Sequence, residues 1–321
     1  MSVLVTGAAG FIGSHVAHAL LERGEAVVGL DSLNDYYDVR LKQARLARLQ
    51  SRPGFAFAPI DVADRDAVTA LLAAHPTVDR IVHLAAQAGV RHSMVDPYAY
   101  VHANVMGHLV VLEAARHLPR LAHLVYASTS SVYGANTALP FRETDRVDTP
   151  VSLYAATKRA DELMSHAYGH LFGIPQTGLR FFTVYGPWGR PDMAYFSFAR
   201  AIMAGEPITL YEGGRLKRDF TYVDDIVAGV LGALDCPPAD PPTRVLNIGN
   251  HRAEEVRTLV GLLEQGLGRR AVIRDAPRPA ADVEETFAAI DEIAALTGFA
   301  PTTPLEIGIP RFIAWFRDWT A

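Results

Sequence analysis

Short apolar runs alternate with longer amphipathic stretches along the first half of the chain. Six of the runs have the length and composition of strands, and they cover residues 3–5, 26–30, 55–60, 80–84, 123–127 and 177–182. Stretches with helical periodicity separate the later runs, near residues 65–74, 98–117 and 154–172. Because strands that alternate with helices form βαβ units, this order predicts an α/β protein with a Rossmann-like, doubly wound parallel sheet.

The pattern changes after residue 182, where proline and glycine begin to interrupt the apolar runs. Residues 236–242 contain four prolines and predict a loop. We therefore expect an NAD-binding domain over residues 1–182 and a smaller, mostly C-terminal α/β substrate lobe over residues 183–321. An apolar run near residues 245–250 predicts a strand that returns to the main sheet, so the two lobes need not be contiguous in sequence.

A glycine-rich turn lies between the first apolar run and the first helical stretch. Residues 7–13 read Gly-Ala-Ala-Gly-Phe-Ile-Gly, and Ile12, Val16 and Leu20 then recur at helical spacing. When strand, glycine turn and helix follow in this order, the glycines let the backbone approach a pyrophosphate at the positive helix N-terminus. The predicted dinucleotide contacts in this turn are Gly7, Gly10, Phe11, Ile12 and Gly13.

Residues at three further strand ends complete the predicted cofactor site. Asp31 ends the second run, 18 residues after Gly13, where its carboxylate can accept hydrogen bonds from the adenosine ribose and repel a 2′-phosphate. The sequence therefore favours NAD over NADP. The third and fourth runs end at the same carboxyl edge, where dinucleotides bind. They contribute the remaining predicted contacts, Asp61, Val62, Leu84, Ala85 and Ala86.

Tyr154 and Lys158 lie four residues apart in a predicted helix, and a hydroxyl-rich run at residues 127–134 precedes them. Residues i and i+4 share one face of a helix, so the Lys158 ammonium can lie near the Tyr154 phenol. A positive charge there stabilises the phenolate and lowers a pKa that is about 10 for free tyrosine. Tyr154 then becomes a usable general base.

Composition narrows the possible partners. Half of the 321 residues are apolar and a fifth are charged, which is typical of a globular protein. A net charge of −5 gives no support for nucleic-acid or membrane binding. The single cysteine, Cys236, allows no internal disulfide, and the 12 histidines show no metal-ligand spacing. With a first strand at residue 3 and no apolar run near the roughly 20 residues of a membrane helix, we expect a cytoplasmic protein.

Four motifs together resemble the extended short-chain dehydrogenase/reductase family of nucleotide-sugar epimerases and dehydratases. They are T-G-A-A-G-F-I-G, S-T-S-S-V-Y-G, Y-x-x-x-K and R-D-F-T-Y-V-D-D. Within that family, residues 34–39, 83–91 and 180–194 are similar to UDP-glucuronate 4-epimerases, and the likeness runs to about Asn250. The resemblance implies a UDP-sugar substrate, a tightly held NAD that is recycled in each turnover, and often a homodimer.

The resemblance also assigns catalytic roles by position. Thr129, 25 residues before Tyr154, falls where the family places a hydroxyl that binds the sugar hydroxyl being oxidised. Tyr154 would take the proton of that hydroxyl while a hydride leaves the same carbon for the nicotinamide. Lys158 would also hold the nicotinamide ribose, so Tyr154 and Lys158 count among the predicted cofactor contacts as well.

The two positions after Thr129 separate the activities within the family. Dehydratases of the family carry Asp-Glu there, and decarboxylases keep a Glu at the second position. Here both residues are hydroxyls, Ser130 and Ser131, which can hydrogen-bond a substrate carboxylate but cannot act as acid or base near neutral pH. Oxidation followed by re-reduction is the chemistry that remains.

A uronic acid substrate needs its carboxylate restrained, because its 4-keto intermediate is a β-keto acid that loses CO₂ readily. Thr183, Ser130 and Ser131 are the candidate restraints, and Arg190 either joins them or is a surface or domain-closing charge. Arg218 resembles the diphosphate-binding arginine of the family, and residues 208–211 resemble its uracil platform. In the last third, Pro279 and Ala281 depart from the family pattern, and the adjacent Arg278 is expected to compensate.

We therefore expect an enzyme that interconverts UDP-glucuronate and UDP-galacturonate through a 4-keto intermediate. Three alternatives stay open: a neutral UDP-hexose 4-epimerase, a UDP-glucuronate decarboxylase, and a non-catalytic NAD-binding sensor. The helical stretches at 98–117 and 154–172 carry apolar residues on more than one face. That pattern fits either a helix-pair interface of a homodimer or plain packing on the sheet.

Overall fold

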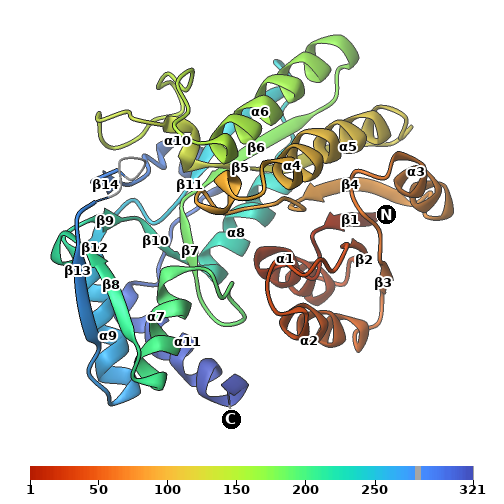
Figure 1. Cartoon of the computed structure of the whole chain (residues 1–321). Helices are drawn as coiled ribbons and strands as arrows, with labels where there is room; N and C mark the ends of the chain where they lie inside the picture. Colours follow the sequence, from red (N-terminus) through yellow and green to blue (C-terminus); the bar gives the residue numbers. More distant parts are fainter. Residues whose placement is uncertain (279–282, 321) are drawn as a thin grey trace.

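The computed structural model describes residues 1–278 and 283–320, and its centre is a seven-stranded parallel sheet (Figure 1). The strands are β1 (Ser2–Thr6), β2 (Ala26–Leu30), β3 (Phe55–Ala58), β4 (Val78–His83), β5 (His123–Thr129), β6 (Gln176–Phe181) and β11 (Thr243–Ile248). Their order is β11-β6-β5-β4-β1-β2-β3, so the direction of progression reverses between β1 and β4. The predicted doubly wound α/β sheet is confirmed, and its switch point is where dinucleotides bind.

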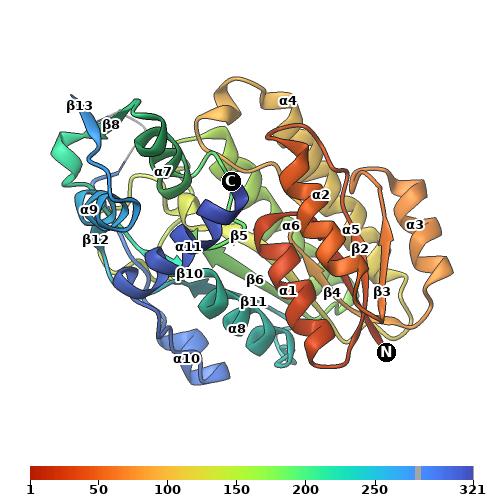
Figure 2. The ribbon, with the colours of Figure 1, turned by 90° about the horizontal axis from the view of Figure 1, so that it is seen from below.

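Helices cover both faces of this sheet (Figure 2). Along β1, Val3 and Val5 point to one core cluster and Leu4 to the other, as the period of two requires. The first cluster packs under α1 (Phe11–Glu22), α2 (Val39–Gln50) and α8 (Val223–Leu234). The second packs under α3 (Arg65–Ala74), α5 (Gly107–Arg116) and α6 (Leu153–Phe172). The sequence pattern had not indicated α2.

The predicted helix over residues 98–117 is present, but its first half contains a π-helical stretch that the sequence pattern had not indicated. The segment is divided into α4 (Pro97–Tyr100), a π-helical stretch (Val101–Met106) and α5. At the centre of the π-helical stretch, the buried Asn104 side chain donates to Gln87 O (3.0 Å) and Thr157 Oγ1 (2.9 Å) and accepts from Gln87 N (2.8 Å). Such π-helical turns are frequent at functional sites, and this one ties α6 to the segment that follows β4.

A smaller lobe is built from groups of two or three short strands and from helices, at the left of Figure 1. Its strands are β7 (Thr183–Tyr185) with β10 (Phe220–Tyr222), β8 (Pro207–Tyr211) with β13 (Val272–Ala276), and β9 (Lys217–Arg218) between β12 (Glu254–Glu255) and β14 (Glu285–Thr286). Its helices are α7 (Ala194–Ala204), α9 (Val256–Leu267) and α11 (Leu305–Thr320), whereas α10 (Asp291–Thr297) packs against α8 and β11 of the main sheet.

The chain does not stay in the smaller lobe after it first enters it. After β10, helix α8 packs under the main sheet, and β11 then pairs in parallel with β6, from Thr243 beside Gln176 to Ile248 beside Phe181. The chain re-enters the smaller lobe at β12. In the described part of the chain, no helix is long and apolar enough to cross a membrane.

Candidate active site

The glycine turn after β1 packs so closely that side chains would not fit. Gly7 has a φ of +71°, and a Cβ atom added to it would lie 2.8 Å from Ala85 N. A Cβ atom added to Gly13 would lie 2.1 Å from Gly7 O, and Gly10 N donates to that same oxygen at 2.8 Å. Gly10 precedes α1 and gives it no side-chain cap. The turn therefore leaves the N-terminus of α1 without a side-chain cap, and an uncapped helix N-terminus is the kind of site that a pyrophosphate binds.

Asp31 lies at the end of β2, directly beside this turn. Its Oδ2 accepts from Ala9 N at 3.0 Å and its Oδ1 accepts from Leu33 N at 2.9 Å. Each carboxylate oxygen has further lone pairs, so the same group can accept hydrogen bonds from a ribose. The structure thus gives Asp31 a second task that the sequence had not indicated, which is to hold the glycine turn.

The other predicted cofactor residues lie along the same carboxyl edge. Leu84 N donates to Thr6 O (3.2 Å) and Ala85 N donates to Thr6 Oγ1 (3.1 Å), so the end of β4 runs beside the turn. Ala86 follows Ala85 on this edge. Phe11 and Ile12 form the first turn of α1.

Asp61 and Val62 follow β3 at this edge. Asp61 Oδ1 accepts from Ala63 N, and Asp61 Oδ2 lies 2.9 Å from His102 Nε2. Partial burial raises the pKa of Asp61, but these two hydrogen bonds outweigh it and the net pKa is lowered. Val62 is buried and packs so tightly that a Cβ added to Gly107 would lie 2.6 Å from its Cγ1.

The predicted catalytic residues come from two neighbouring elements. Thr129 is the last residue of β5; its Oγ1 accepts from Ser131 N at 3.2 Å and donates to Ser131 Oγ at 3.3 Å. Ser130 and Ser131 begin a short 3₁₀ turn (Ser130–Tyr133), and both are half-buried. Tyr154 lies in the first turn of α6, is half-buried, and meets Tyr100 edge to face at 6.0 Å between ring centroids.

Lys158 lies one turn along α6 from Tyr154, and it forms a hydrogen bond with a residue that the sequence had not indicated. Lys158 Nζ donates to Asp161 Oδ2 at 2.6 Å, and both side chains are buried. Burial raises the pKa of the Asp161 carboxyl, although the Lys158 ammonium acts in the opposite direction. His83 is also near this charge: burial and the Lys158 ammonium lower the pKa of His83 to about 3. The sequence could have indicated this ion pair, because a carboxylate three residues after a lysine lies on the same face of a helix.

The candidate residues for the substrate carboxylate lie on the facing segment. Thr183 begins β7, is half-buried, and its N–H donates to Asp219 O at 3.0 Å. Arg190 is partly buried; its Nη2 donates to Ala88 O at 3.3 Å and its Nε donates to Asp192 Oδ1 at 3.1 Å. Arg190 therefore contacts the segment that follows β4, at the boundary between the two lobes.

The two remaining predicted arginines lie in the smaller lobe. Arg218, in β9, donates to Lys217 O at 2.7 Å and to Glu284 O at 3.3 Å. Arg278 forms a 3.7 Å ion pair with the exposed Glu284. The predicted departures at Pro279 and Ala281 lie outside the described residues.

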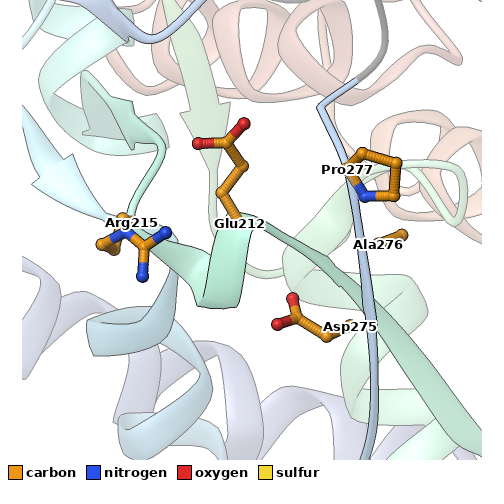
Figure 3. A pocket seen from close by; sticks show the side chains of 5 residues that line it. All are labelled: Glu212, Arg215, Asp275, Ala276 and Pro277. Carbon is orange, nitrogen blue, oxygen red and sulfur yellow. The ribbon is translucent and has the colours of Figure 1, made fainter.

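A cavity of about 350 Å³ opens where β8 and β13 end (Figure 3). Asp275 on one wall accepts a hydrogen bond from Gly213 N at 2.8 Å. Next to it, Arg91 lies over the ring of Tyr211 at 5.2 Å, so the segment after β4 reaches across to the end of β8. The lining residues are Glu212, Arg215, Asp275, Ala276 and Pro277.

Arg45 connects the cofactor side to the smaller lobe, and sequence reasoning missed it. The buried Arg45 donates to Ala9 O in the glycine turn (3.2 Å) and to Trp188 O (2.9 and 2.6 Å) and Gly189 O (2.9 Å) in the segment entering the lobe. Leu41 and Leu49, four residues before and after it, are buried on the same helix face. The sequence could have indicated the burial of Arg45, because this arginine occupies a core position of an amphipathic helix.

Comparison with known proteins adds three likenesses. The pattern of the NAD dependent epimerase/dehydratase family matches residues 3–249. A probable UDP-glucuronate 4-epimerase of Rhizobium meliloti is 47% identical over 98% of this chain and 97% of its own length. UDP-glucuronate 4-epimerase 1 of Arabidopsis thaliana is 47% identical over 99% of this chain and 77% of its own length.

A solved structure is similar as well. The UDP-glucuronic acid 4-epimerase of Bacillus cereus, in complex with UDP-glucuronic acid and NAD, superposes with a TM-score of 0.92 at 34% identity, and the likeness covers 99% of this chain and 100% of that chain.

Proposed function

The chain belongs to the NAD dependent epimerase/dehydratase family, and from this premise we propose that it interconverts UDP-glucuronate and UDP-galacturonate by epimerisation at C4. The observation that carries the proposal is the full-length likeness to UDP-glucuronate 4-epimerases at 47% identity. The chain is thus an NAD-dependent nucleotide-sugar epimerase. The bound NAD supplies the acceptor, and later the donor, of the hydride.

The residues at the carboxyl edge of the sheet have the chemistry that this reaction needs. Thr129 orients the C4 hydroxyl by a hydrogen bond, and the Tyr154 phenolate removes its proton as the hydride leaves C4. The Lys158 ammonium, on the same face of α6, favours the phenolate form of Tyr154. The 4-keto sugar then rotates so that its opposite face is reduced, and Tyr154 returns the proton to the new C4 alkoxide. The reaction needs no acid or base other than Tyr154. This agrees with the hydroxyl side chains of Ser130 and Ser131, which cannot act as acid or base near neutral pH.

The carboxylate of the sugar needs separate control during the keto stage. A 4-keto uronate loses CO₂ when its carboxyl carbon bond aligns with the carbonyl π system. We assign Ser130, Ser131 and Thr183 to hold the carboxylate out of that alignment, and Arg190, which is ion-paired with Asp192, to contribute from the lobe boundary. The half-buried hydroxyls at the end of β5 and the start of β7 support this assignment. Arg218 and Arg278 are assigned to the nucleotide end.

One incubation tests the activity and its alternatives. Purified protein is given UDP-glucuronate without added NAD, and the products are separated into uronates, pentoses and CO₂. We expect UDP-galacturonate and negligible CO₂. UDP-pentose with stoichiometric CO₂ would instead indicate a decarboxylase. Equal epimerisation of UDP-glucose would indicate a neutral hexose epimerase, and no product with any sugar would favour an NAD-binding sensor.

We also propose a homodimer, located in the cytoplasm. Tyr98, Val101 and Met106 are exposed along the α4 and π-helical segment, and Leu163 and Leu171 are exposed on the adjacent α6. An apolar helix pair of this kind can be buried by a second copy about a two-fold axis. Light scattering on the purified protein tests this, with Leu163→Glu expected to yield monomers. The absence of any disulfide partner for Cys236 supports a reducing compartment.

A further inference from the structure

Lys158 and Asp161 form a buried ion pair on α6, and Lys158 lies one helical turn after the proposed general base, Tyr154. The Lys158 and Asp161 side chains are 2% and 0% exposed, and the Nζ to Oδ2 distance is 2.6 Å. Asp161 Oδ1 is also buried, and it has no hydrogen-bond partner among the described residues. The Asp161 carboxylate therefore has a single strong contact, and that contact is the ammonium on which Tyr154 depends.

The other carboxylate next to this pair is neutralised elsewhere. Glu162 accepts from Arg180 through both oxygens, at 2.9 Å each, and also from Arg159 (2.9 Å) and Ser128 Oγ (2.6 Å). These charge-assisted hydrogen bonds lower the pKa of Glu162 in spite of its burial. Glu162 and its arginines thus form a separate, compensated cluster.

The groups that face the pair from the sheet and from α5 are neutral. Burial and the Lys158 ammonium lower the pKa of His83, on β4, to about 3. Burial likewise holds the pKa of His108, on α5, well below its ordinary value. Burial raises the pKa of Tyr126, on β5, and the Asp161 carboxylate is one of the charges that raise it further. Among these groups, Asp161 is therefore the one anion whose charge is balanced by Lys158 alone.

We propose that Asp161 is a positioning residue that competes with the Tyr154 phenolate for the Lys158 ammonium, and so sets the pH above which the catalytic tyrosine is ionised. This inference rests on the proposed function. Two anions that share one buried cation each weaken the hold of the other. Asp161 fixes the ammonium on the α6 face below Tyr154, and its negative charge partly cancels the field that favours the phenolate.

Asp161→Asn tests the proposal, because Asn has the same shape and keeps an oxygen that can accept from Lys158 Nζ. Loss of the charge leaves the ammonium to Tyr154 alone. We expect the acid limb of the kcat profile of the NAD-loaded enzyme to move about one unit to lower pH. Asp161→Glu keeps the charge and should keep the limb near its wild-type position. Melting temperature and NAD content of both variants control for folding.

Three results would overturn the proposal. If the acid limb of the Asp161→Asn kcat profile stayed in place while the maximal kcat fell, Asp161 would have a purely structural role. A limb that moves to higher pH would mean that Asp161 acts mainly by keeping Lys158 protonated. A limb that moves equally in Asp161→Glu would show that geometry, and not charge, is responsible.

A second readout needs no turnover. The near-ultraviolet absorbance of tyrosinate is titrated in the NAD-loaded protein, and the curve for the Tyr154→Phe variant is subtracted to isolate Tyr154. We expect the same shift to lower pH in Asp161→Asn. If the protein proved inactive on UDP-glucuronate, the proposed function would fail while this titration still decided the role of Asp161.

Discussion

The cofactor side and the substrate side of the candidate active site are built in different ways. On the cofactor side, backbone atoms meet at the edge of one sheet: a Cβ on Gly13 would lie 2.1 Å from Gly7 O, and Asp31 accepts from Ala9 N. On the substrate side, the outermost candidates are two long side chains, Arg218 on β9 and Arg278 with its 3.7 Å ion pair, two residues after β13 ends. Backbone contacts tolerate almost no added volume, whereas flexible arginines can readjust.

This difference teaches where a site is sensitive to substitution. Close-packed backbone leaves no room to relax, so one added methyl group causes strain. An exposed ion pair contributes little free energy, so the loss of one of its partners has a small effect. We therefore expect the effects of single substitutions to fall from the glycine turn, through the catalytic residues, to the outer arginines.

The largest effect is expected for Gly13→Ala. The added Cβ would meet Gly7 O, a backbone atom that also accepts a hydrogen bond from Gly10 N. Overpacking of about 3 kcal/mol or more should lower NAD affinity by about 10² or more, measured as NAD retained through gel filtration. Gly261→Ala in α9 is the matched control, because nothing lies within 4 Å of its added Cβ. Equal NAD retention in both variants would contradict the comparison.

Tyr154→Phe should lower catalysis without disturbing the packing of the cofactor side or of the substrate side. Turnover should fall by about 10² or more, because the general base is lost. Folding and NAD content should stay nearly unchanged, since the Tyr154 hydroxyl has no hydrogen bond in the described structure that Phe would break. Single-turnover rates on UDP-glucuronate give the measurement. Near wild-type turnover would remove Tyr154 from the mechanism.

Asp31→Ala should have an intermediate effect, and the property that changes should be the preference for NAD over NADP. The wild type should bind NAD in preference to NADP, because the carboxylate repels a 2′-phosphate. The variant loses the acceptors for Ala9 N and Leu33 N, each worth about 0.5–1.5 kcal/mol, so its NAD affinity should fall about tenfold while its preference relaxes. Titration with both cofactors checks this. Equal wild-type dissociation constants would disprove the role of Asp31.

The paired substitution Ser130→Ala/Ser131→Ala should change KM only modestly, because each hydrogen bond contributes about 0.5–1.5 kcal/mol. Its larger consequence should be a change in product. With the carboxylate less restrained, more CO₂ and UDP-4-keto-pentose should form per epimerisation than in the wild type, and Thr183→Val should act in the same direction. Trapping of labelled CO₂ measures this partition. A slower enzyme with an unchanged, negligible yield of CO₂ would rule out the restraint.

Arg278→Ala should have the smallest effect. Its exposed ion pair with Glu284 is worth no more than about 1 kcal/mol, so KM for the UDP-sugar should rise a few-fold at most and less at high salt. Arg120→Ala, an exposed arginine just before β5 and so at the opposite edge of the sheet, is the matched control. A loss as large as that of Gly13→Ala would reverse the comparison.

Sequence reasoning succeeded where a local backbone pattern determines structure. The glycine turn and the strand-end Asp31 could be placed from spacing alone, because strand, turn and helix follow within a few residues. The π-helical stretch around Asn104 could not, because the Asn104 side chain bonds to Gln87 and Thr157, which are distant in sequence. Arg45 and Asp161 look like solvated helix charges until tertiary packing shows that both are buried.

The pairing of β11 with β6 has a consequence for how the protein is made. Residues 1–182 leave the ribosome with β6 as an open sheet edge, and its partner strand follows more than sixty residues later, at Thr243–Ile248. Until then, the unpaired N–H and C=O groups of β6 can recruit strands from other chains. The newly made chain should therefore need its edge shielded by a chaperone during elongation, and a fragment that stops at residue 182 should aggregate where the full-length chain folds.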